Sequence, residues 1–332
     1  MRAIQVNAYG GSKELTLADV PVPEPGDGEV LVRLAYAGIN FIDVYMRQGV
    51  YKNLKTYRNE PPFTLGMEGA GTVDAVGAGV DGLRTGDRVA YCLSLGSYAE
   101  FAVVPAWRLV RVPDGIDFPI ATTLMLQGCT AHYLTHSLFP LEAGHTCLVH
   151  AGAGGVGQLV IQLARHRGAR VLATVGTEEK AGIARRLGAD AAILYTEVDF
   201  ADAVLEATGG KGVDVVYDSV GQATFAGSLR CLRRRGTCAL FGGSSGAVTS
   251  VNPLDLAEAG SVFLTRPHLA SYTADADEIR GRAADLFAMV ADGRLRVAIH
   301  EELPLAEAAR AHDTIEARQT KGKLLLVAGG AG

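Results

Sequence analysis

The chain has 332 residues, of which 48% are hydrophobic and 20% charged, a composition typical of a folded protein with two domains. Its formal net charge of -5 gives no general attraction to phosphate backbones or anionic lipid surfaces, so we expect no nucleic-acid or membrane partner. The first residues lack the long apolar stretch of a secretory signal, and the five cysteines form no Cys-x-x-Cys pair. These features predict a cytoplasmic protein whose cysteines are reduced and buried.

In chain order, residues 1–123 contain short β-like runs broken by Pro and Gly, which predicts a β-rich domain. Residues 124–266 repeat an apolar strand, a glycine turn and a helix, which predicts a doubly wound parallel sheet. The strands expected there are 146–150, 170–174, 191–194, 213–217 and 236–241, with helices at 158–167 and 178–187. Residues 277–292 predict a further helix, and the last strand, 323–327, is expected to return to the first domain.

Residues 152–157 read Gly-Ala-Gly-Gly-Val-Gly and match G-x-G-x-x-G, directly between a predicted strand and a predicted helix. Glycines allow the backbone to approach a pyrophosphate closely, and the helix N-terminus supplies unpaired N–H groups. This context predicts a dinucleotide-binding (Rossmann) domain. The residues assigned to the turn are Gly152, Gly154, Gly155, Val156 and Gly157.

The end of the second strand predicts which dinucleotide is bound. NAD sites place an acid about twenty residues after the first glycine, where it accepts the ribose hydroxyls. Here the position 22 residues after Gly152 is Thr174, and residues 174–177 are all neutral before Lys180. A missing acid and a nearby cation suit the extra phosphate of NADPH. An exposed helical lysine without a cofactor role is the alternative for Lys180.

Several motifs together resemble the quinone oxidoreductase (zeta-crystallin-like) branch of the medium-chain dehydrogenase/reductase family. They are residues 38–43 with Tyr45, 86–89, 151–157, 217–221 and 241–246. The resemblance covers essentially the whole chain. It implies an α/β protein in which a Rossmann domain, 124–266, is inserted in a GroES-like catalytic domain, 1–123 and 267–332, with the active cleft between them.

The same resemblance implies a set of contacts to NADPH, most of which the residues alone would not single out. Besides the glycine turn, they are Phe41, Ile42, Asp43, Val44, Tyr45, Thr130, Gly176, Thr177, Lys180, Tyr195, Ser219, Phe241, Gly242, Gly243, Ser244, Pro267, His268, Leu269 and Arg318. An isolated tyrosine or arginine is more often structural or solvated.

No metal is expected, because the positions that hold zinc ligands in zinc-containing relatives are occupied here by Asn40, Met67 and Leu126. The four-cysteine lobe of those relatives is also absent. Many quinone oxidoreductases that resemble this chain carry Lys-Gly where it has Gln127-Gly128, so a role for that lysine does not carry over.

Without a metal, the expected chemistry is hydride transfer from NADPH to an electron-poor quinone. Asn40, Tyr45 and Tyr51 are the candidates for orienting the acceptor oxygen, although polar contacts within loops are the alternative for each. A reductase of α,β-unsaturated carbonyls (enones or alkenals) and a non-catalytic NADPH- or RNA-binding protein are the competing functions. The resemblance also implies a homodimer formed through an apolar edge strand at 261–265.

Overall fold

The computed structural model describes residues 1–53 and 59–329. The chain folds into two units, one formed by Met1–Cys129 with Thr273–Gly332 and the other by Thr130–Tyr272. The expected domain boundaries lie six residues earlier at both junctions. Near the first junction, Leu126 donates its backbone N–H to Glu68, and both residues belong to the first unit.

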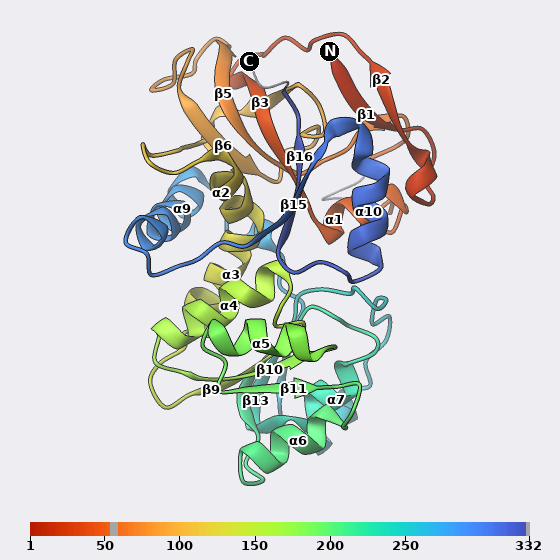
Figure 1. The fold of residues 1–332 in the computed structure, drawn as a ribbon, viewed down its shortest axis with the longest axis vertical. Helices are drawn as coiled ribbons and strands as arrows, with labels where there is room; N and C mark the ends of the chain where they lie inside the picture. The colour runs from red at the N-terminus through yellow and green to blue at the C-terminus, as the bar shows by residue number, and fades with distance from the viewer. Residues whose placement is uncertain (54–58, 330–332) are drawn as a thin grey trace. The chain divides into compact units, whose positions relative to one another are not determined.

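The first unit is β-rich, with helices at its margins (Figure 1). Its main elements are β1 (Arg2–Val6), β2 (Leu15–Asp19), β3 (Glu29–Ile39), α1 (Phe41–Arg47), β4 (Phe63–Thr64), β5 (Glu68–Val76), β6 (Arg88–Cys92), β7 (Phe101–Pro105), β8 (Val110–Arg111), α2 (Phe118–Thr123), the π-helix Leu124–Gly128, α9 (Ala276–Ala291), β15 (Ile299–Pro304), α10 (Ala308–Glu316) and β16 (Lys323–Val327).

The strands of this unit form two sheets, in the orders β2-β1-β4 and β15-β16-β3-β5-β6-β8, with β7 also paired to β3. Strand β16 pairs antiparallel with β3, with Leu324 opposite Ile39. The prediction that the last strand returns to the first domain is therefore confirmed. This pairing also brings Lys323 beside the turn that follows β3.

The second unit contains one parallel sheet in the order β11-β10-β9-β12-β13-β14. Helix α3 (Cys129–Tyr133) spans its first boundary, and its other main elements are the π-helix Leu134–Leu138, β9 (Thr146–Val149), α4 (Gly155–His166), β10 (Arg170–Val175), α5 (Glu178–Arg186), β11 (Ala191–Leu194), α6 (Phe200–Ala207), β12 (Val213–Asp218), α7 (Phe225–Arg230), β13 (Leu232–Leu240), α8 (Pro253–Glu258) and β14 (Phe263–Thr265). Helix α5 packs on β10 and β11, and α7 on β12 and β13.

The predicted strands and helices of this unit are confirmed, although several of their boundaries are shifted. Strand β13 starts at Leu232, four residues earlier than expected, and β10 continues one residue further, to Val175. Helix α4 starts at Gly155, so two glycines of the fingerprint lie in its first turn. Glycine is a poor helix former, so the sequence pattern predicts a helix that starts only after the last glycine of the fingerprint.

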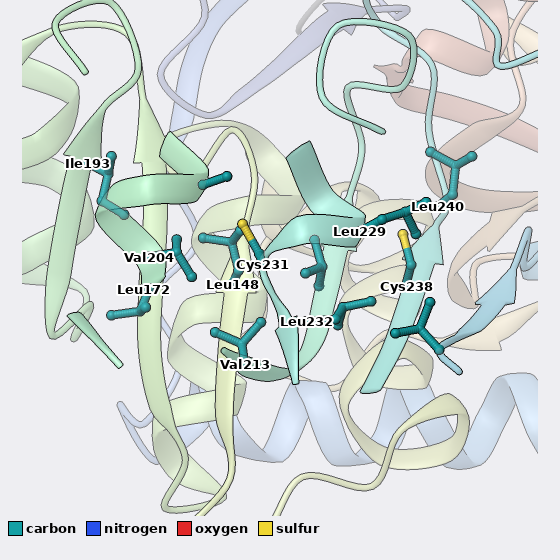
Figure 2. Close-up of a cluster of buried hydrophobic side chains, with 13 residues drawn as sticks. Leu148, Leu172, Ile193, Val204, Val213, Leu229, Cys231, Leu232, Cys238 and Leu240 are labelled. Atoms are coloured by element: carbon teal, nitrogen blue, oxygen red, sulfur yellow. The ribbon is translucent and has the colours of Figure 1, made fainter. Parts of the chain in front are cut away.

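Figure 2 shows a hydrophobic core of this unit, built from side chains of neighbouring strands and the helices that pack on them. Leu148, Leu172 and Val216 come from β9, β10 and β12, and each is fully buried. Truncating one such leucine to alanine costs about 2–5 kcal/mol. The core therefore holds the carboxyl ends of these strands, where the glycine turn lies, in a fixed arrangement.

All five cysteines are buried and free. Among the described residues, no helix is both long enough and apolar enough to cross a membrane.

Candidate functional site

The glycine turn lies between β9 and α4. A Cβ atom at Gly157 would be 2.3 Å from the Ala151 carbonyl oxygen, and one at Gly152 would be 2.8 Å from the Ala173 Cβ. Side chains are excluded at both positions, because real Cβ atoms do not approach other atoms this closely. No side chain caps α4 at Gly154, so its first N–H groups remain available to an anion. The turn has the geometry that a pyrophosphate requires.

The end of β10 carries the residues expected to select the cofactor. A Cβ atom at Gly176 would lie 2.7 Å from the Tyr195 hydroxyl oxygen, so Tyr195 occupies the space of any side chain there. Thr177 caps α5 by accepting a hydrogen bond from the Lys180 N–H at 3.3 Å. The structure thus brings Gly176, Thr177, Lys180 and Tyr195 together. Thr174, in contrast, is 2% exposed, with its hydroxyl 2.8 Å from the His150 ring.

The loops after β12 and β13 are bonded to each other. The Ser244 N–H donates to the Ser219 carbonyl at 3.2 Å, and a Cβ at Gly242 would lie 2.3 Å from that same oxygen. In a parallel sheet, the carboxyl ends of the strands share one edge, which is where dinucleotides bind. The expected cofactor residues that follow strands β9 to β14 at this edge are Gly152 to Gly157, Gly176 to Lys180, Tyr195, Ser219, Phe241 to Ser244, and Pro267 to Leu269. Thr130 lies in α3 of the same unit.

A second group of expected site residues lies in the first unit, on α1 and just after it. The Phe41 and Tyr45 rings are 6.0 Å apart on one helix face, and Tyr45 meets Tyr51 edge to face at 5.7 Å. All three are partly exposed. Aromatic rings in this arrangement form an apolar surface with phenol groups at its margin. Arg318 follows α10, which is bonded to α1 through Arg47 and Glu316.

Asn40 precedes α1, and its amide is engaged by other residues of the chain. Its Nδ2 donates to Glu68 Oε2 at 2.9 Å, and its Oδ1 accepts from Lys323 Nζ at 2.8 Å. Lys323 also donates to Glu68, and both side chains are fully buried. A Cβ at Gly38 would lie 2.0 Å from Glu68 Oε2, so glycine leaves room for the ion pair. At 4% exposure, Asn40 holds this turn in place.

The same cluster contains the positions at which the resemblance places the zinc ligands of zinc-containing relatives. Here the amide of Asn40, the buried thioether of Met67 and the hydrocarbon side chain of Leu126 stand at the expected ligand positions. The buried Lys323 ammonium already pairs with Glu68, the one carboxylate of the set. No group of three or more metal-ligating side chains occurs among residues 1–53 and 59–329. These residues do not fit a zinc ion.

A buried hydrogen-bonded network connects α1 with α10. Asp43 Oδ2 accepts from the Asn40 N–H at 2.8 Å and from the Tyr98 hydroxyl at 3.2 Å. Tyr98 in turn is 3.1 Å from His312 Nε2, and Arg47 donates to His312 Nδ1 at 3.1 Å. Burial raises the pKa of Asp43 to about 7, while burial and the Arg47 charge lower the pKa of His312 to about 3.

His312 is expected to make the fold sensitive to acid. Because its folded-state pKa lies below the ordinary value of 6.5, the folded chain binds fewer protons, and its stabilising contribution is lost as pH falls from 6.5 toward 3. His312 then changes the free energy of unfolding by up to about 1.4 kcal/mol per pH unit. Asp43, with a raised pKa, acts in the opposite direction between its ordinary value of 3.8 and about 7. In urea unfolding of wild type and His312→Gln across this range, the free energy of unfolding should rise less steeply with pH in the variant.

His166→Gln, at an exposed histidine, is the matched control. Equal slopes in wild type and His312→Gln would show that His312 does not resist protonation in the folded chain.

Sequence reasoning missed several of these polar groups. The pattern of residues 323–327 predicts only a strand, and no local pattern in the sequence pairs Glu68 with a cation. A lysine that begins a strand of three leucines and a valine was a signal, because lysine is almost never buried unless it is paired. Nothing comparable marked His312 or Tyr98, which lie 214 residues apart.

A β-rich unit joined to a parallel sheet that carries a glycine turn defines the class of dinucleotide-binding oxidoreductases with a GroES-like domain. Two family models match the chain accordingly. Residues 26–114 match the alcohol dehydrogenase GroES-like domain, and residues 155–284 match the zinc-binding dehydrogenase family.

Similar proteins identify the branch. A quinone oxidoreductase from Pseudomonas aeruginosa is 44% identical over 327 residues, covering 98% of this chain and 99% of that protein. A 2-haloacrylate reductase from Burkholderia sp is 42% identical over 329 residues, covering 98% of each. The crystal structure of Escherichia coli quinone oxidoreductase complexed with NADPH is 39% identical, with a TM-score of 0.94, and covers 98% of this chain and 100% of that one. The chain belongs to the quinone oxidoreductase branch of the medium-chain dehydrogenase/reductase family.

Proposed function

We propose that this protein is an NADPH-dependent quinone oxidoreductase that works without a metal. The observation that carries the proposal is the full-length likeness to quinone oxidoreductases, including one solved with NADPH, in a chain whose glycine turn excludes side chains. The free, buried cysteines suit a reducing compartment and support the expected cytoplasmic location.

The residues of the second unit fit the cofactor. The glycine turn would hold the pyrophosphate, and Lys180 with Tyr195 would meet the ribose phosphate. NADPH supplies the hydride when it is bound. Both amide atoms of Asn40 bond to the chain. We assign orientation of the acceptor oxygen to Tyr45 and Tyr51, whose phenol rings are partly exposed. Asn40 then acts as a positioning residue at the start of α1.

An acceptor panel tests the function. NADPH oxidation should be measured with a benzoquinone, a naphthoquinone, a simple enone and a 2-haloacrylate, with product analysis for each. We expect the highest kcat/KM with a quinone and a two-electron product. A higher value for the enone or haloacrylate would favour the second candidate, a reductase of conjugated carbon–carbon double bonds, to which the 42% identity to 2-haloacrylate reductase points. No oxidation with any acceptor would favour a non-catalytic binding role.

Preference for NADPH over NADH is expected to depend on Lys180. A charge-assisted hydrogen bond contributes about 1.5–3 kcal/mol, which corresponds to roughly tenfold or more in affinity. Lys180→Ala should therefore raise the KM for NADPH about tenfold while leaving KM for NADH and the kcat nearly unchanged. Arg318→Ala should act likewise. Lys211→Ala, at an exposed lysine before β12, is the control. An equal loss for both cofactors would contradict this assignment.

We also propose a homodimer through β14. This strand ends the sheet order, and within the described chain it pairs only with β13. Phe263 on β14 is 63% exposed and Leu254 on the preceding helix is 70% exposed, an apolar edge that a second copy would cover. Light scattering should give the mass of two chains, and Phe263→Asp should give one. Val198→Asp, also at an exposed apolar residue, should remain dimeric. A wild-type monomer at micromolar concentration would refute the dimer.

A further inference from the structure

Four buried polar side chains form a continuous chain at the carboxyl ends of the central strands in the second unit. His150 follows β9, Thr174 lies on β10, Asp218 ends β12 and Ser228 lies on α7. Their exposed fractions are 1%, 2%, 0% and 0%, respectively. A buried polar group needs a hydrogen-bond partner, and each of these has one within the group.

The bonding order follows from the number of protons available. Ser228 has one hydroxyl proton, which it donates to Asp218 Oδ2 at 2.7 Å. Its oxygen can then only accept from His150 Nε2 at 3.0 Å, so the proton of the imidazole is on Nε2. Burial lowers the pKa of His150, which favours the neutral imidazole. In the neutral form Nδ1 carries no proton, so it accepts from the Thr174 hydroxyl at 2.8 Å.

The two ends of this hydrogen-bonded network contact two segments at the edge of the sheet where a dinucleotide would bind. At one end, the Thr174 carbonyl accepts from the Gly152 N–H at 3.0 Å and ties down the glycine turn. At the other end, Asp218 Oδ1 accepts from the Val220 and Gly221 N–H groups at 2.8 and 2.9 Å, which shapes the loop carrying Ser219. The order of winding reverses between β9 and β12, the position where open α/β sheets bind dinucleotides. His150 spans that position.

We propose that His150 is a positioning residue for the dinucleotide and sets the spacing between the glycine turn and the Ser219 loop. The inference rests on the proposed binding of NADPH. It also accounts for the Thr174 hydroxyl, which is bonded to His150.

Direct titration of NADPH and NADH against His150→Phe tests the proposal. Phenylalanine keeps most of the ring volume and removes both hydrogen bonds. We expect Kd to rise about tenfold for both cofactors, because one or two buried hydrogen bonds at about 1 kcal/mol each correspond to this change, and the turn and loop contact the shared part of the cofactor. The kcat with a quinone at saturating NADPH should change less than twofold.

Further variants separate positioning from stability. Thr174→Val removes the hydroxyl that bonds to His150 Nδ1. It should raise Kd for both cofactors in the same way, which keeps the test open if His150→Phe folds poorly. His150→Gln keeps a donor for Ser228 and should restore part of the affinity. Thr208→Val removes a hydroxyl that accepts from the Gly212 N–H before β12, so it should lower the melting temperature without changing Kd.

The outcomes are distinct for the function and for the inference. If wild type binds NADPH and both His150→Phe and Thr174→Val bind it equally well, His150 is only structural and the inference is overturned. If wild type does not bind NADPH, the proposed function fails together with the inference.

Discussion

Lys323→Met is expected to destabilise the folded chain by about 3–5 kcal/mol, because it leaves the buried Glu68 carboxylate without its cation. Burial already raises the pKa of Glu68, and the Lys323 charge opposes that effect. Removing the ammonium should make the carboxyl still harder to ionise, so the loss should be smaller at low pH, where Glu68 takes up a proton. Thermal unfolding should show a decrease in Tm of roughly 10 °C at neutral pH.

A double variant tests whether the charge is responsible. Lys323→Met with Glu68→Gln removes both charges and should recover part of the lost stability, because a neutral amide is less costly to bury. Lys13→Met, at an exposed lysine, should stay within about 0.5 kcal/mol of wild type. If Lys323→Met matched that control, the ion pair would have no role in holding Asn40 and the start of α1.

Gly157→Ala is expected to weaken the binding of NADPH and NADH alike by about 100-fold, because a displaced turn loses one or two hydrogen bonds to the charged pyrophosphate, each contributing about 1.5–3 kcal/mol. The added Cβ would lie 2.3 Å from the Ala151 carbonyl oxygen and 3.0 Å from the Gly152 Cα. Because both of these neighbouring atoms belong to the backbone, α4 or the turn must move. Titration of both cofactors measures the loss, and their ratio should stay at the wild-type value since the pyrophosphate is common to both.

Gly281→Ala is the matched control, because Gly281 lies in α9 and its added Cβ would meet no atom within 4 Å apart from its chain neighbours and the nearby backbone of its own helix. Alanine favours a helix interior over glycine by about 1 kcal/mol, so this variant should be slightly more stable, with unchanged cofactor affinity. A Gly157→Ala variant with a Kd within threefold of wild type would mean that the turn does not hold the pyrophosphate closely.

The sequence alone was sufficient for features that depend on local patterns. The strands and helices of the second unit follow from short-range hydrophobic periodicity and from the glycines that end helices. The glycine turn was predictable for the same reason, since residues 152–157 are contiguous and lie between a strand and a helix. The cofactor choice also came from local residues, the neutral 174–177 segment followed by Lys180.

The tertiary structure alone decided which polar groups meet. Lys323 and Glu68 are 255 residues apart in sequence, and only the pairing of β16 with β3 brings them to Asn40. The exclusion of a side chain at Gly176 depends on Tyr195, which reaches it from the end of the neighbouring strand. The two side-chain partners of His150 come from different elements, Thr174 from β10 and Ser228 from α7. Periodicity describes each segment against its own neighbours, whereas a buried charge or hydroxyl is satisfied by whichever distant segment the sheet order places beside it.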